Sequence, residues 1–131
     1  MIRRLIPLGA LLLITSAAAA PEQRQLDAHQ RVIIKQYVLR EAKASILSSR
    51  DGEPKAFAHA LELALRAAGA WVAVDGSNSV GRAQDGLTVI YDHSVPADSS
   101  IFLALQRAGL NPKDEDVPGA PVSTIIVGPR S

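Results

Sequence analysis

The residues that could take part in chemistry are few in this chain, and the most suggestive group is the tripeptide Asp92-His93-Ser94. Aspartate, histidine and serine are the residue types of a hydrolytic triad, in which a carboxylate orients an imidazole base that activates a hydroxyl. Adjacent residues of one chain point in different directions, so these three side chains cannot line up as that mechanism requires. We therefore predict a polar turn here and no catalytic residue, with a small hydrolase that uses Asp92 and His93 as the alternative.

Metal ligands are the next candidates, and their spacing does not favour a site. His29 and His59 have no second histidine three or four residues away, which is the spacing of a metal-binding pair on a helix, so we expect both on the surface. The acidic run at residues 114–116 lacks the alternating ligand spacing of a calcium loop, so we expect it in solvent. The chain has no cysteine, which excludes disulfides and thiolate ligands. We predict neither a metal nor a cofactor.

The sole tryptophan, Trp71, could serve as a platform on which a ligand stacks. It follows the Gly69-Ala70 pair directly and opens an apolar run, so it is predicted to begin a strand just after a helix ends. A tryptophan in that position usually packs against the end of the helix. We therefore expect Trp71 in the core rather than in a binding site.

Three helices and four strands are predicted to position these residues. The second and third helices show apolar residues at helical spacing and end before Gly69 and Gly109, where a left-handed C-terminal residue belongs. The strands, apart from the first, are rich in β-branched or aromatic residues, and two of them are apolar enough to be covered on both faces. The helices are predicted at residues 26–42, from about 54 to 68 and from about 98 to 108; the strands are predicted at 44–48, 71–74, 87–91 and 124–128; the connection at 75–86 and the segment 111–122 are expected to be solvated loops.

A repeat at an offset of 40 residues organises these elements. Residues 63–70 and 103–110 align without a gap, and each copy reads as strand, helix, glycine and strand, which is a βαβ unit. Neighbouring strands joined by such a crossover are parallel. We therefore predict an α/β fold with a short four-stranded parallel sheet built from two βαβ-like repeats, and with the helix at 26–42 packed across one face. The alternative is a ferredoxin-like α+β sheet of the split βαβ type.

The parallel arrangement would create one candidate binding crevice. Ligands of open parallel sheets gather outside the carboxyl ends of the strands where the strand order reverses. If strands one and three form the central pair, that crevice lies between Ser49, Arg50 and Asp51 on one side and Asp92 and His93 on the other. Arg50 would then hold an anion or a carboxylate of a partner. The simpler interpretation, which we favour, is two unrelated polar turns.

The first residues have the pattern of an export signal. Arg3 and Arg4 precede an apolar run over residues 5–14 and a small-residue end, which is the pattern of a secretory signal. The apolar stretch is shorter than the ~20 residues of a spanning helix, and cleavage after Ala19 satisfies the A-x-A rule. We predict a signal peptide at residues 1–19 and a single domain at residues 20–131. An uncleaved signal-anchor is the alternative, and both place the domain in the periplasm or elsewhere outside the cytoplasm.

Length and charge set the limits of this domain. The chain has 131 residues, which is room for one small domain. Its 14 basic and 13 acidic residues give a formal net charge of +1, so it has no long-range field that would attract nucleic acid. We expect no nucleic-acid partner, and contact with a membrane only through the N-terminal segment.

The two L-x-x-A-G helix ends at residues 65–69 and 105–109 and the closing Ile-Ile-Val-Gly-Pro-Arg at 125–130 carry a resemblance. The order of elements resembles the small uncharacterised envelope-associated domains of many bacteria, and it is faintly similar to the C-terminal domain of LytR-type cell-wall proteins. That resemblance implies an extracytoplasmic domain and carries over no catalytic residue. We expect an exported, non-enzymatic module that binds an envelope protein or a small ligand. The alternatives are a small periplasmic hydrolase or metal-dependent enzyme and a structural accessory of an envelope complex.

Overall fold

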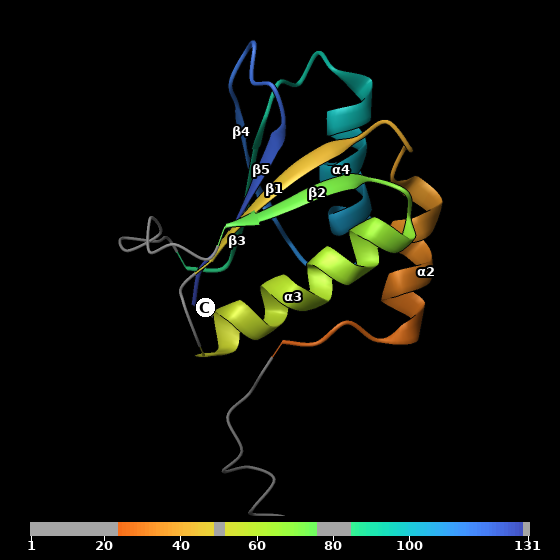
Figure 1. Ribbon diagram of the computed structural model, residues 1–131, viewed down its shortest axis with the longest axis vertical. Helices are drawn as coiled ribbons and strands as arrows, with labels where there is room; N and C mark the ends of the chain where they lie inside the picture. The colour runs from red at the N-terminus through yellow and green to blue at the C-terminus, as the bar shows by residue number, and fades with distance from the viewer. Residues whose placement is uncertain (1–23, 49–51, 76–84, 130–131) are drawn as a thin grey trace, which may run out of the picture.

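The computed structural model describes residues 24–48, 52–75 and 85–129 of the chain (Figure 1). The predicted signal segment, residues 1–19, lies outside these ranges. The elements in chain order are α2 (Ala28–Tyr37), β1 (Lys43–Ser48), α3 (Gly52–Ala67), β2 (Trp71–Asp75), β3 (Leu87–Tyr91), α4 (Pro96–Arg107), β4 (Lys113–Asp116) and β5 (Ser123–Val127).

The strands form one five-stranded mixed sheet in the order β2-β1-β5-β3-β4. β1 pairs in parallel with both β2 and β5, and β3 pairs in parallel with β4, but β3 and β5 are antiparallel. The α/β class is confirmed, and all four predicted strands are present. The prediction of an all-parallel, four-stranded sheet is wrong, because β3 and β4 run against the other three. The ferredoxin-like alternative also fails, because β2 and β3 are not neighbours.

β4 is the one strand of the described residues that the sequence analysis does not predict. Residues 111–122 were expected to form a solvated loop, yet Lys113–Asp116 pairs with β3 from Thr88 to Tyr91. All four side chains of β4 are exposed. A strand with no buried side chain leaves no period of two in hydrophobicity, so only the backbone pairing that follows α4 creates it.

The internal repeat is visible in the fold as two βαβ units, β1-α3-β2 and β3-α4-β4. The two helix ends are equivalent: the Ala70 N–H donates to the Leu65 carbonyl and the Leu110 N–H donates to the Leu105 carbonyl, each at 3.1 Å. The sequence suggested that the strand at 124–128 closes the second unit, but the closing strand is β4. That strand, β5, instead lies between the two units.

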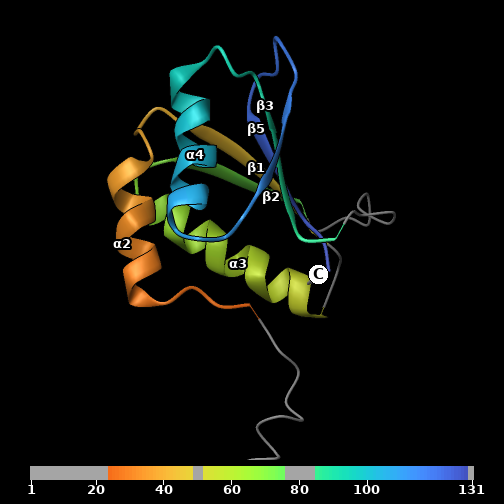
Figure 2. The same ribbon diagram turned by 180° about the vertical axis from the view of Figure 1, so that it is seen from behind.

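The three helices of the described residues lie on one side of the sheet, where α2 packs against both α3 and α4 (Figure 2). The burial of β1 and β5 alternates accordingly. In β5, Ser123, Ile125 and Val127 are buried under the helices, whereas Thr124 and Ile126 on the other face are half-buried. The expectation that this strand is covered on both faces is therefore wrong, and one face of the sheet carries no helix from the described part of the chain. In β3, by contrast, Thr88 on that other face is buried, although Ile90 is only half-buried.

The first helix is shorter than predicted because its ends are fixed by specific backbone features. Asp27 caps α2 with a capping box, in which its carboxylate accepts from the Gln30 N–H at 2.7 Å and its own N–H donates to the Gln30 side chain at 3.0 Å. At the other end Val38 is extended, so the chain leaves the helix there. Ile34 is the fully buried residue of α2, and it packs into the core beside α3 and α4.

Candidate functional site

The premise of the predicted crevice, a parallel central pair formed by the first and third predicted strands, is not met, because β5 lies between β1 and β3. Ser48, the last residue of β1, pairs with Val127, which in turn pairs with Leu87, the first residue of β3. The carboxyl end of β1 therefore lies beside the start of β3, and Asp92 follows the opposite end of that strand. Asp92 and His93 therefore lie at the opposite end of the strands from the carboxyl end of β1. Ser49, Arg50 and Asp51 lie outside the described residues.

The segment after β3 is the predicted polar turn, and Asp92 holds it together. One carboxylate oxygen of Asp92 accepts from the Ser94 N–H at 2.9 Å and from the Ser94 hydroxyl at 2.7 Å. The other accepts from the Gly119 N–H at 2.8 Å, which ties the turn to the loop after β4. The hydrogen bonds from Ser94 and Gly119 lower the pKa of Asp92, because all of them favour the ionised carboxylate.

His93 faces the acidic strand β4 rather than Asp92. Its Nε2 lies 3.2 Å from Asp114 Oδ2, and its backbone N–H donates to Asp116 Oδ1 at 3.0 Å. The imidazole also lies beside the Tyr91 ring, with 4.4 Å between the centroids. Burial raises the pKa of the Tyr91 hydroxyl, and the carboxylates of Asp114 and Asp116 raise it further.

This arrangement does not assemble a nucleophile and its base. The Ser94 hydroxyl donates to Asp92, whereas the His93 ring is paired with a different carboxylate, on β4. A hydrolytic site needs the hydroxyl and the imidazole to face each other. Among the described residues no group of three or more metal-ligating side chains comes together either. Sequence reasoning missed the His93 and Asp114 contact because it missed β4.

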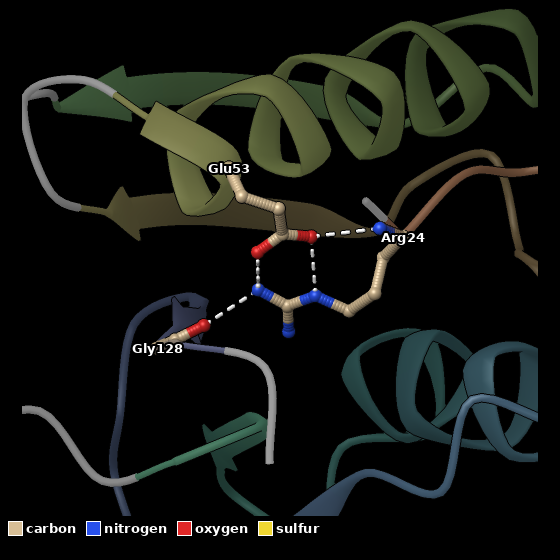
Figure 3. Close-up of polar contacts among 3 residues, drawn as sticks. All are labelled: Arg24, Glu53 and Gly128. Atoms are coloured by element: carbon tan, nitrogen blue, oxygen red, sulfur yellow. Dashed lines mark hydrogen bonds and ion pairs between the residues drawn. The ribbon is translucent and has the colours of Figure 1, made fainter. Parts of the chain in front are cut away.

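A second polar cluster joins three distant parts of the chain (Figure 3). The Arg24 guanidinium and the Glu53 carboxylate form two hydrogen bonds, at 2.7 Å from Nε and 2.6 Å from Nη2, and the Arg24 N–H donates to the same carboxylate at 2.9 Å. Nη2 also donates to the Gly128 carbonyl at 2.6 Å, and the guanidinium lies 4.7 Å from the centre of the Phe57 ring. Because these contacts already engage both charges, we assign the cluster a structural role as a clasp.

The third candidate is a groove at the amino ends of β1 and β2, and Trp71 dominates it. The expectation that Trp71 is buried is wrong, because the residue is 61% exposed. The reason is the alternation of strand residues between the two faces of the sheet. Val72 takes the inward position and is buried, so Trp71 faces the side without helices. Because Trp71 and Val72 are neighbours in the predicted strand, the period of two places their side chains on opposite faces, and a check of this register could have revealed the exposure of Trp71.

The groove has a volume of about 760 Å³ and is lined by residues 40–43, 69–71 and 121–122. Its lining is mainly apolar and includes Ala70 and Val122 as well as Trp71. Arg40 and Lys43 are exposed at its rim, together with the acidic Glu41. An exposed indole can stack on an apolar or aromatic group, and the two cations of the same groove can attract a carboxylate.

Comparison of the chain with protein-family models, with curated proteins and with solved structures gave no match.

Proposed function

We propose that this protein is an exported, non-enzymatic interaction module of the cell envelope, and that it binds its partner through the groove at Trp71. The observation that carries the proposal is the 61% exposure of the only tryptophan in the chain. Large aromatic side chains cost free energy when they stay in water, and they are the residue types most enriched among the anchors of protein interfaces. An exposed tryptophan in a groove is therefore best explained by a partner that covers it.

The groove also suggests the chemistry of that partner. Arg40 and Lys43 give the rim two positive charges against the single negative charge of Glu41. Opposite charges at an interface rim favour association and select the partner. The best fit is a segment of an envelope protein that places an apolar side chain on the indole and a carboxylate near Arg40 and Lys43.

A capture experiment with a matched control tests this proposal. The wild-type protein, Trp71→Ala and Leu63→Ala are used as baits in envelope extract, because Leu63 is 54% exposed on α3 and does not line the groove. We expect the same partner on the wild type and on Leu63→Ala, and its loss from Trp71→Ala. Titration with the purified partner should then shift the emission of Trp71, the only tryptophan of this chain, after the emission of the partner alone is subtracted. A partner that binds Trp71→Ala as tightly as the wild type would contradict the proposal.

The hydrolase alternative rests on the contact between His93 Nε2 and Asp114 at 3.2 Å, which is the base and orienter of a triad without its hydroxyl. Esterase, phosphatase and peptidoglycan-cleavage assays on the wild type and on His93→Ala separate the two functions. Turnover by the wild type that disappears in His93→Ala would replace the interaction module with an enzyme.

Export is the remaining part of the proposal, and it rests on the sequence of residues 1–19. No helix in the described parts of the chain is long and apolar enough to cross a membrane. The intact mass of the protein recovered from the periplasm tests the cleavage after Ala19. A mass that still includes Met1 would mean that the segment remains as an anchor.

A further inference from the structure

The two edges of the sheet differ in how they are protected, and this difference is the starting point. At one edge, β4 consists of Lys113-Asp114-Glu115-Asp116, whose four side chains are charged and exposed. Charged side chains on an edge strand oppose pairing with another chain. At the other edge, β2 begins Trp71-Val72-Ala73-Val74 and has no charge or proline over these four residues.

The outer edge of β2 offers unpaired backbone groups at two positions. The Trp71 N–H donates inward to the Ala42 carbonyl at 3.0 Å, and residues of a strand alternate in the direction of their N–H and C=O groups. The backbone N–H and C=O groups of Val72 and Val74 therefore point outward, away from β1. The Val72 carbonyl already accepts a hydrogen bond from Arg66 Nη2 at 3.0 Å. Within the described residues, the other outward groups of these two valines have no hydrogen-bond partner.

We propose that β2 pairs with β2 of a second copy of this chain in antiparallel orientation, with the twofold axis at Ala73. This register places Val72 of each copy opposite Val74 of the other, so their outward N–H and C=O groups complete four hydrogen bonds. A symmetric dimer requires a self-complementary edge of this kind. Val74, which is 43% exposed, would then pack its side chain against the other copy. The inference goes beyond the proposed function, because pairing through the backbone does not need the indole of Trp71.

The charges beside the edge favour the same arrangement. Arg66 lies at the level of Val72, and Glu62, 2.9 Å from Arg66, lies one helical turn earlier. α3 runs back along β2 (Figure 1), and four helical residues span about the same ~6 Å as two strand residues, so Glu62 lies at about the level of Val74. The antiparallel register therefore brings Arg66 of each copy near Glu62 of the other. Arg66 can then leave the Val72 carbonyl and keep a carboxylate partner.

Disulfide trapping tests the register, and the absence of cysteine from the chain makes it clean. Ala73 and its counterpart would form a non-hydrogen-bonded pair, whose Cα atoms lie about 4.5 Å apart, within the range of a disulfide. We expect Ala73→Cys to give a covalent dimer on mild oxidation of the full chain. Glu115→Cys, exposed on the opposite edge, is the matched control and should remain mainly monomeric. Equal cross-linking of the two variants would overturn the register.

The mass of the protein in solution tests the pairing itself. The wild type should have twice the mass of one chain in sedimentation, and Val74→Pro, which removes an outward N–H but no bond to β1, should be a monomer. Val74→Lys, a charge on the edge, should also be a monomer and covers the case in which the proline variant does not fold. Trp71→Ala should remain a dimer even where it loses its partner. A monomeric wild type, or a dimer that survives both Val74 variants, would overturn the inference.

Discussion

At the scale of single residues, Asp92 illustrates how a residue type suited to catalysis can be used for architecture. Its carboxylate accepts three hydrogen bonds, two from Ser94 and one from Gly119, and is thereby committed to the turn after β3. A carboxylate held this way orders two loops that are far apart in the sequence. The same contacts make the stability of the protein depend on pH.

We predict that Asp92→Asn destabilises the fold most at neutral pH. The pKa of Asp92 is lowered in the folded state, so its ionised form favours folding. This contribution is fully present above the pKa of an unfolded aspartate, about 3.9, and is lost as the pH falls through the lower folded value. Urea unfolding at a series of pH values should show a gap between wild type and variant that closes in acid.

Ser94→Ala is the companion variant, because the Ser94 hydroxyl donates the hydrogen bond that lowers this pKa most. It should retain part of the pH dependence, since the backbone donors of Ser94 and Gly119 remain. A stability gap between the wild type and Asp92→Asn that stays constant from neutral to acidic pH would contradict the assignment.

At the scale of elements, the equivalent helix ends of α3 and α4 are the most regular feature of the fold. Leu65 and Leu105 are both fully buried and stand four residues before Gly69 and Gly109. Both glycines have a positive φ, of 98° and 82°, which a residue with a side chain rarely adopts. Each leucine therefore occupies the same place in its βαβ unit.

From this equivalence we predict that Leu65→Ala and Leu105→Ala each cost about 2–5 kcal/mol of the free energy of unfolding, because each leaves a cavity in the core. Leu63→Ala provides the control on the same helix, since Leu63 is 54% exposed and should cost less than about 0.5 kcal/mol. Chemical denaturation of the three variants measures all of these values. A cost for either buried leucine as small as that of Leu63→Ala would mean that the helix end is not part of the core.

The elements also show which features a sequence can reveal. The ends of α3 and α4 and the strands β2, β3 and β5 were predictable, because glycine stops and β-branched runs report local conformation. The direction of β3 was not, because the residues that connect it to β2 carry no pattern that fixes direction. β4 was missed because its four charged residues are held by backbone pairing alone. The strand order removed the premise of the predicted crevice. The Trp71 groove was missed because the residue type of Trp71 was considered without its position in the alternation of the strand.

At the scale of the whole molecule, the clasp of Arg24 and Glu53 connects the ends of the described chain. Arg24 precedes α2, Glu53 lies in the first turn of α3, and Gly128 follows β5 (Figure 3). Both charged side chains are 16% exposed, so solvent screens their attraction less than at a fully exposed pair. The clasp thus holds the segment before α2 against the end of the central strand.

The last prediction concerns the energy of this clasp. Arg24→Gln should lower the free energy of unfolding by about 1.5–3 kcal/mol, the range of hydrogen bonds to charged groups, because it leaves the Glu53 carboxylate partly buried without its guanidinium. Glu53→Gln should cost a similar amount, and Arg24→Gln with Glu53→Gln should cost less than the sum of the two, since both remove one interaction. Arg31→Gln, at an exposed position on α2, is the control and should change stability little. Strictly additive costs in this cycle would show that Arg24 and Glu53 stabilise the fold independently. The contact between the two side chains would then contribute nothing to stability, which would contradict the clasp.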